Sequence, residues 1–397
     1  MTDVENIERL IFRVFGIKKH IRARANTNSC ISPLNTKNPG LFAYNFQERL
    51  SRICNAFSTN RAALFEIAER VKNIAEAKEW GWAGPYSELV ALDFFSQFPA
   101  LQKISYINRL PVREHTLSVA AQNGRKEIID IDILLESRQT RIFTDVKSFN
   151  SVHLQILDSI FLDIEEFARA TLKKSILIGA TNLSSVDYSE VKAHLGQQKN
   201  KIKEALKSAV SHGERSFDYS DESGLFFRFK IEYSGSLSTV SEYSPYAMAE
   251  AYRTKFLDYG EKLLDDEYSV ITVVKNPWFN KEVVDFGGFN NIFYRALARR
   301  TFLELSKDKS LASSCSRQYA NSSLRVCDIS RSLAGIFFID DNSFQSREQR
   351  TLYSAYFYLN PVYCIKEPLT VRKLEKSFRG SAQEQIKDFD DFKWDNY

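Results

Sequence analysis

The sequence predicts a mixed α/β protein. In some segments apolar residues recur at helical spacing, and in others they alternate with polar residues. The composition agrees, because 44% of the residues are hydrophobic and the chain contains 30 phenylalanines. Such a chain has enough apolar surface for a packed core, which excludes a disordered or fibrous protein.

Length, charge and cysteine content narrow the class of protein. A chain of 397 residues predicts two or three domains. The net charge of +4 permits a nucleic-acid partner without requiring one. The five cysteines form no C-x-x-C pair, and the acidic start MTDVENIERLIF differs from a secretory signal. No apolar stretch approaches the roughly 20 residues of a membrane span. We therefore expect a cytoplasmic protein with no membrane partner.

Residues 1–78 are expected to form a helical accessory region. A helix over about residues 1–25 runs into a basic segment, and residues 26–40 form a loop rich in Asn, Ser, Pro and Gly. Apolar residues within 44–78 recur at three-, four- and seven-residue spacings. That pattern predicts a pair of helices that face a core.

Residues 79–215 are expected to form the central domain. Gly84 and Pro85 open a helix that ends near Phe98. The short segment ESRQT separates two strands and therefore predicts an antiparallel hairpin. In chain order, strand patterns cover 103–110, 115–121, 126–135, 141–149 and 174–182, and helical patterns cover 152–172 and 188–211.

Residues 216–397 are expected to form a C-terminal α/β region that recognises or senses a substrate. Strand patterns cover 225–233, 268–275 and 333–340, and a helical pattern covers 290–307. The polar stretch 211–224 is interpreted as a boundary. The acidic end, 386–397, is interpreted as a surface tail.

Charged residues with chemical potential gather on two neighbouring strands. Asp130 and Asp132 are two apart on one strand, and Asp145 and Lys147 are two apart on the next, so each pair shares a face. A hairpin brings the two faces together. Glu88 lies on the apolar stripe of its helix, where an ionised carboxylate requires a cation or a hydrogen-bond donor.

In these features the segment 79–182 resembles the PD-(D/E)XK nuclease superfamily, whose core runs helix, three strands, helix, strand. The resemblance implies a restriction-endonuclease-like core with Glu88, Asp132, Asp145 and Lys147 as catalytic residues. It also implies that Glu88, Asp132 and Asp145 bind the metal, and that Lys147 positions the attacking water. A polar residue on the following helix, Gln155, matches a position used in some branches of the family.

The choice between Asp130 and Asp132 stays open, because isoleucine precedes both residues where the family motif has proline. We favour Asp132, which is followed by an apolar run and lies nearer the hairpin. Two carboxylates with a phosphate oxygen suit Mg²⁺, and Mn²⁺ is a substitute.

The resemblance leads to the hypothesis of a metal-dependent nuclease. We expect DNA rather than RNA as the substrate, an endonuclease, and a setting in restriction or anti-phage defence. Cleavage of both strands is compatible with a homodimer or a partner protein. Zinc sites based on histidine pairs, nucleotide-hydrolysing P-loops and G-x-S-x-G nucleophiles are all missing from the sequence.

Two other interpretations remain. In the first, a nuclease-like fold binds nucleic acid or acts as a scaffold without turnover. It would use basic helix faces formed by Lys199, Lys203, Lys207, Arg295 and Arg299. In the second, the charges are structural: the aspartates of the first strand face solvent, Asp145 and Lys147 form a surface pair, and Glu88 is capped locally.

Overall fold

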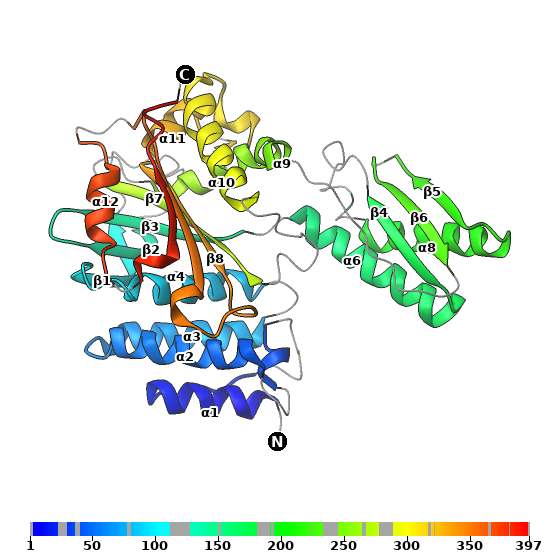
Figure 1. Ribbon diagram of the computed structural model, residues 1–397, viewed down its shortest axis with the longest axis horizontal. Coiled ribbons are helices and arrows are strands. Elements are labelled where there is room, and N and C mark those ends of the chain that lie inside the picture. Colours follow the sequence, from blue (N-terminus) through cyan, green and yellow to red (C-terminus); the bar gives the residue numbers. More distant parts are fainter. Residues whose placement is uncertain are drawn as a thin grey trace. The chain divides into compact units, whose positions relative to one another are not determined.

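The protein is described by a computed structural model, which separates the chain into two units (Figure 1). The larger unit comprises Met1–Phe149 and Pro245–Tyr397, and the smaller unit comprises Asn150–Ser244. The described residues are 3–22, 30–35, 40–77, 81–111, 128–149, 152–180, 191, 194–222, 224–232, 245–263, 267–277, 289–316, 319–320, 322–363, 367–380 and 382–395.

The larger unit is built on a mixed sheet that has seven strands among the described residues, in the order β1-β2-β3-β7-β8-β9-β10. The strands are β1 Lys103–Pro111, β2 Ile128–Glu136, β3 Arg141–Ser148, β7 Tyr268–Lys275, β8 Gly335–Asp341, β9 Tyr353–Leu359 and β10 Ile386–Asp390. The first three strands are antiparallel neighbours, β3, β7 and β8 run parallel, β9 is antiparallel to β8, and β10 is parallel to β9. The mixed α/β class is confirmed, as is the antiparallel hairpin around ESRQT.

Helices cover both faces of this sheet. The described helical segments of the larger unit are α1 Asp3–Phe15, η1 Ser32–Asn35, α2 Leu41–Ala56, α3 Arg61–Glu76, α4 Ala83–Ser96, α9 Pro245–Tyr252, η4 Arg253–Lys262, α10 Phe289–Arg299, η6 Arg300–Glu304, η7 Leu305–Lys307, η8 Ala312–Ser314, α11 Val326–Ser332, η10 Gln349–Thr351, α12 Val371–Ser377 and η11 Gln383–Gln385. Phe95 of α4 packs on Phe337, whereas Tyr294 of α10 stacks on Phe338, the next residue of β8. Because neighbouring residues of a strand point to opposite faces, α4 and α10 lie on opposite sides of the sheet.

The N-terminal helices are part of this unit rather than a separate accessory region. They form successive layers below the sheet, with α2 and α3 packed on α4 and α1 packed on α2 and α3 (Figure 1). Arg49 of α2 is fully buried and its guanidinium lies 2.9 Å from a carboxylate oxygen of Asp341 at the end of β8. The same guanidinium donates to the hydroxyls of Tyr86 and Tyr353. This buried network ties the helical layers to the sheet.

The smaller unit has its own sheet and core. Its elements are α6 Val152–Phe167, η2 Ala168–Leu172, β4 Ser175–Ala180, α8 Leu195–Ser211, β5 Ser216–Ser220 and β6 Phe226–Glu232. In the described part of the unit, three antiparallel strands are ordered β4-β6-β5. Ile164, Ile202, Phe227 and Phe229 belong to a buried cluster distinct from the core of the larger unit.

The expected central domain is therefore wrong in its second half. The strand expected at 174–182 forms as β4, but it belongs to the smaller sheet. The parallel neighbour of β3 is instead β7, which follows after the smaller unit in the chain. The boundaries expected at residues 78/79 and 215/216 also differ from those of the two units, since residues 150–244 form an insertion between β3 and the rest of the larger unit.

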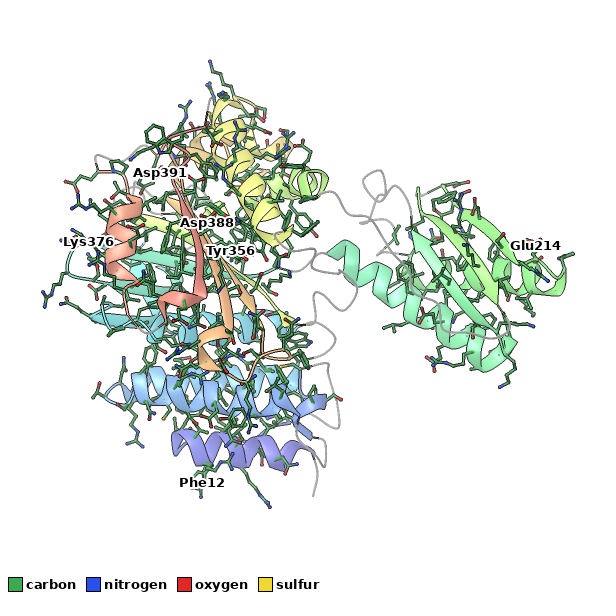
Figure 2. All side chains as sticks on the ribbon, in the orientation of Figure 1. Phe12, Glu214, Tyr356, Lys376, Asp388 and Asp391 are labelled. Carbon is green, nitrogen blue, oxygen red and sulfur yellow. The ribbon has the colours of Figure 1, made fainter. Side chains whose placement is uncertain are left out.

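Two polar segments were also misinterpreted. Residues 216–220, within the expected boundary, form β5, and the expected surface tail contributes β10 to the sheet. Asp388 of β10 is in register with Tyr356 of β9, and both residues are labelled in Figure 2. The strand expected at 115–121 lies outside the described residues. Among the described helices, none is both long enough and apolar enough to cross a membrane.

Candidate functional site

The site begins where the pairing of β2 and β3 ends. Their register runs from Glu136 opposite Arg141 to Ile133 opposite Thr144. At the next position, the Asp132 carboxylate accepts a hydrogen bond of 2.8 Å from the backbone N–H of Val146. Just beyond the paired residues, a backbone N–H of β3 therefore donates to a side chain of β2. This contact holds Asp132 beside Asp145.

Asp132 and Asp145 form a pair of buried carboxyls, and each influences the ionisation of the other. Burial, together with the negative charges of Asp145 and Glu88, raises the pKa of Asp132 to about 8. Burial also disfavours ionisation of Asp145, but Lys147 and Lys262 outweigh it and lower the pKa of that carboxyl. At neutral pH, Asp132 is therefore the protonated partner and Asp145 the ionised one.

Two lysines contact the Asp145 carboxylate, one at each oxygen. Lys147 Nζ lies 2.5 Å from Oδ2, and Lys262 Nζ lies 2.7 Å from Oδ1. The Asp145 side chain is only 6% exposed. Lys147 also lies over the ring of Tyr259, with its Nζ 5.4 Å from the ring centroid. The interpretation of Asp145 and Lys147 as a surface ion pair is therefore wrong.

Glu88 reaches the same cluster from α4. Its carboxylate lies 2.8 Å from Arg70 Nε of α3 and accepts a hydrogen bond of 2.5 Å from the hydroxyl of Tyr106 on β1. Burial raises the pKa of Glu88, and Arg70 opposes that rise. The expectation that a glutamate on this apolar stripe meets a cation and a donor is confirmed. Local capping of Glu88 is contradicted, because both partners come from other elements.

Glu88, Asp132, Asp145 and Lys147 are thus brought together as the sequence analysis expected. Asp130 is not part of the cluster, because its side chain is 60% exposed and lies 3.7 Å from Arg109 of β1. Of the two aspartates, the structure places Asp132 beside Asp145 and Asp130 at the surface. Gln155 belongs to α6 of the smaller unit, and its side chain lies outside the described residues.

Three cluster residues were not identified from the sequence: Arg70, Tyr106 and Lys262. Lys262 ends η4 and is 117 residues from Asp145 in the chain. No local spacing links such distant residues, so their meeting is a consequence of the tertiary fold alone. The position of Glu88 on an apolar stripe did indicate that a cation lies beside it, and in the structure that cation is Arg70.

The acidic pair suits a hard divalent cation in its donor chemistry. Carboxylate oxygens are the ligands that Mg²⁺ and Mn²⁺ prefer, and Mg²⁺ takes only one or two of them while keeping several waters. Burial raises the pKa of Asp132, and the negative charges of Asp145 and Glu88 raise it further; a bound cation would offset that repulsion between carboxylates. Asp145 Oδ2 is buried and receives no hydrogen bond of favourable geometry from the described residues. Among those residues, no group of three or more His, Cys, Asp or Glu side chains is arranged as a metal site.

The basic helix faces are largely engaged within the protein. Arg295 lies 2.8 Å from Asp390 and 2.7 Å from Asp395, and Arg299 lies 2.8 Å from the same Asp395. The acidic C-terminal segment thus forms ion pairs with the two arginines that were expected to bind nucleic acid, and both arginine side chains stay partly exposed.

The lysine face on α8 is only partly open. Lys203 lies 2.7 Å from Asp163 of α6, and its Nζ sits over the ring of Phe167. Lys199 is half-buried, and Lys207 is exposed. Lys207 is therefore the most accessible of the three lysines.

Comparison with known proteins gave no family assignment. No family model matches the chain, and neither a curated protein nor a solved structure matches it.

Proposed function

We propose that the chain is a metal-dependent nuclease that hydrolyses phosphodiester bonds at the Asp132–Asp145 pair. The observation that carries the proposal is a buried carboxyl pair at the end of a strand pairing, with a lysine two residues after one of the acids. Mg²⁺ is the favoured cofactor and Mn²⁺ its substitute. DNA is the favoured substrate, and endonucleolytic cleavage the favoured mode.

The topology around the pair supports the proposal. The core in the PD-(D/E)XK resemblance runs helix, three strands, helix, strand. Here α4 precedes β1, β2 and β3, and α9 and η4 precede β7, which lies parallel to β3. In the proposed correspondence, residues 150–244 are an insertion between the third and fourth strands of the core.

The proposed roles follow from the contacts. Asp132 and Asp145 would hold the cation, with Glu88 as an additional ligand or as a charge held in place by Arg70 and Tyr106. When bound, such a cation polarises the phosphate and lowers the pKa of a coordinated water. Asp132 must first give up its proton. Lys147 orients the attacking water and offsets the negative charge that develops on the phosphate.

The setting remains part of the proposal. A cytoplasmic role in restriction or anti-phage defence, with a homodimer or partner protein, rests on what nucleases of this type commonly do. The insertion 150–244 supports a recognition function, because it has its own core and sheet and can carry a separate binding surface.

An inactive nucleic-acid-binding protein is the second candidate. One observation favours it: both oxygens of Asp145 are contacted by lysine ammonium groups, which compete with a metal ion for the same carboxylate. The presence of a second buried carboxyl, Asp132, next to that carboxylate favours the nuclease.

A cleavage assay separates the two candidates. Supercoiled plasmid, linear duplex, single-stranded DNA and RNA are each incubated with Mg²⁺ or Mn²⁺ and the full chain. The variants are Asp145→Asn, Lys147→Met and the control Lys103→Met, whose exposed lysine pairs with Glu136 on β1 and β2. We expect cleavage by wild type and the control, and a loss of about 100-fold or more in the two site variants.

Cleavage that survives both site substitutions would refute the site. Nucleic-acid binding without any cleavage by wild type, over all substrates and both metals, would favour the scaffold.

A further inference from the structure

Lys262 lies outside the expected motif, but its side chain contacts the carboxylate that is proposed to bind the metal. It is the last residue of η4, which lies against β2 in the larger unit. Its Nζ is 2.7 Å from Asp145 Oδ1, and its side chain is 23% exposed. This ammonium therefore takes one oxygen of the carboxylate assigned to metal binding, while Lys147 takes the other.

A metal ion and Lys262 cannot share that oxygen. Mg²⁺ binds oxygen ligands at about 2.0–2.1 Å, so an ammonium held by the same oxygen would lie within a few ångströms of a divalent charge. Repulsion between like charges at such a distance is strong beside a carboxylate that is only 6% exposed. One of the two cations must leave Asp145 Oδ1.

The backbone indicates which of the two lysines leaves the carboxylate. Lys147 lies in the middle of the sheet, where it is in register with Val273 of β7, and it is only two residues from Asp145. Lys262 lies outside the sheet, at the end of a 3-10 segment. Its long flexible stem allows the ammonium to swing while the backbone stays in place.

The charges of the cluster indicate where the ammonium goes. The described acids Glu88, Asp132 and Asp145 face the described cations Arg70, Lys147 and Lys262. Adding a divalent cation to this set gives an excess of positive charge beside the carboxyl pair. A phosphodiester is the anion that the proposed function brings there, and a lysine released from Asp145 can contact it as a point charge.

We propose that Lys262 holds the metal position of Asp145 in the metal-free protein, and contacts a substrate phosphate once a metal ion takes that position. The inference rests on the proposed nuclease function. It adds a second lysine to the reaction, one that comes from the segment following the insertion. Binding of the metal ion then releases the Lys262 ammonium from Asp145, so that it can contact the substrate.

The first test measures Mn²⁺ affinity by calorimetry on the full chain at about pH 8.5, where Asp132 is mostly ionised. The variants are Lys262→Met, Lys262→Gln, Lys262→Arg and the control Lys103→Met. Removing the competing ammonium should tighten Mn²⁺ binding about tenfold, which corresponds to about 1.4 kcal/mol. Lys262→Arg keeps the charge and should stay near wild type, as should the control.

The second test measures binding of a short DNA duplex in Ca²⁺, as a function of salt. Lys262→Met should weaken binding several-fold and lower the salt slope by about one, because one phosphate contact is lost. Lys262→Gln serves as the second neutral variant if Lys262→Met does not fold, as judged by circular dichroism and thermal melting. Tighter Mn²⁺ binding together with weaker DNA binding is the signature of the proposed dual role.

The outcomes separate this inference from the proposed function. Wild type that binds no Mn²⁺ refutes the proposed function itself. Wild type that binds Mn²⁺ no more weakly than both neutral variants refutes competition by Lys262. Unchanged DNA affinity and salt slope in both neutral variants refute the phosphate contact.

Discussion

The raised pKa of Asp132 predicts that metal binding is coupled to the release of a proton. The carboxyl has a pKa of about 8 because it is buried beside Asp145 and Glu88. A cation that binds Asp132 must displace this proton. Each pH unit below about 8 should therefore lower the apparent affinity about tenfold, or about 1.4 kcal/mol. Lowering the pH from about 8 to about 6 should weaken Mn²⁺ binding by about 50-fold, since half of the carboxyl is still protonated at pH 8, and affinity should level off above about pH 9.

Titration calorimetry in two buffers of different ionisation enthalpy measures this coupling directly. Binding should release about 0.9 proton at pH 7 and about 0.5 proton at pH 8, as a group with a pKa of about 8 requires. The control is Asp132→Asn, which has no proton to release at this position. An affinity that stays constant between about pH 6 and pH 8 would refute the raised pKa of Asp132.

The remaining predictions concern stability and surface charge. Arg49→Met should destabilise the larger unit by about 3–5 kcal/mol in urea unfolding, because the buried carboxylate of Asp341 loses the guanidinium that pairs with it. As a control, substitution of the exposed Arg13 by Met should change the free energy of unfolding by less than about 0.5 kcal/mol. Because the folded pKa of Asp132 lies above its ordinary value of 3.8, the folded state binds more protons between about pH 4 and pH 8, and wild-type stability should fall as pH rises through that window. Asp132→Asn should remove this part of the slope, up to about 1.4 kcal/mol per pH unit, in urea titrations at several pH values. Arg295→Ala should leave DNA affinity unchanged in filter binding, because the C-terminal acids already pair with Arg295; a large loss would show that the tail yields to DNA.

Local features of the fold were predictable from the sequence because they depend on short spacings. The hairpin of β2 and β3 follows from period-two strands around ESRQT, and the same spacing places Asp145 and Lys147 on one face. The burial of Glu88 follows from its place on an apolar helical stripe, and its need for a cation follows from the cost of an unpaired buried charge.

Long-range pairing was not predictable in the same way. The segments 174–182 and 268–275 are both short and apolar, and periodicity does not specify which of them pairs with β3. The order of segments along the chain favours the first, but the insertion of residues 150–244 leaves the second beside β3. Lys262 meets Asp145 for the same reason, since the chain returns to the larger unit only after residue 244.

Charge patterns also have meaning only in the context of the fold. The sequence shows arginines on one helix and aspartates near the C-terminus as separate features. The structure joins them, because β10 brings Asp390 beside Arg295. The choice between Asp130 and Asp132 has a similar basis. The two residues have the same composition around them, but only Asp132 lies where the pairing with β3 ends.

Anomalous diffraction from crystals soaked in Mn²⁺ at about pH 8.5, where Asp132 is mostly ionised, tests the central claim most directly. The account predicts a manganese peak between the carboxylates of Asp132 and Asp145, at about 2.0–2.3 Å from their oxygens, with Lys262 turned away from Asp145. Crystals in which both lysines remain on Asp145 and no manganese binds there, at a concentration that supports cleavage, would contradict it.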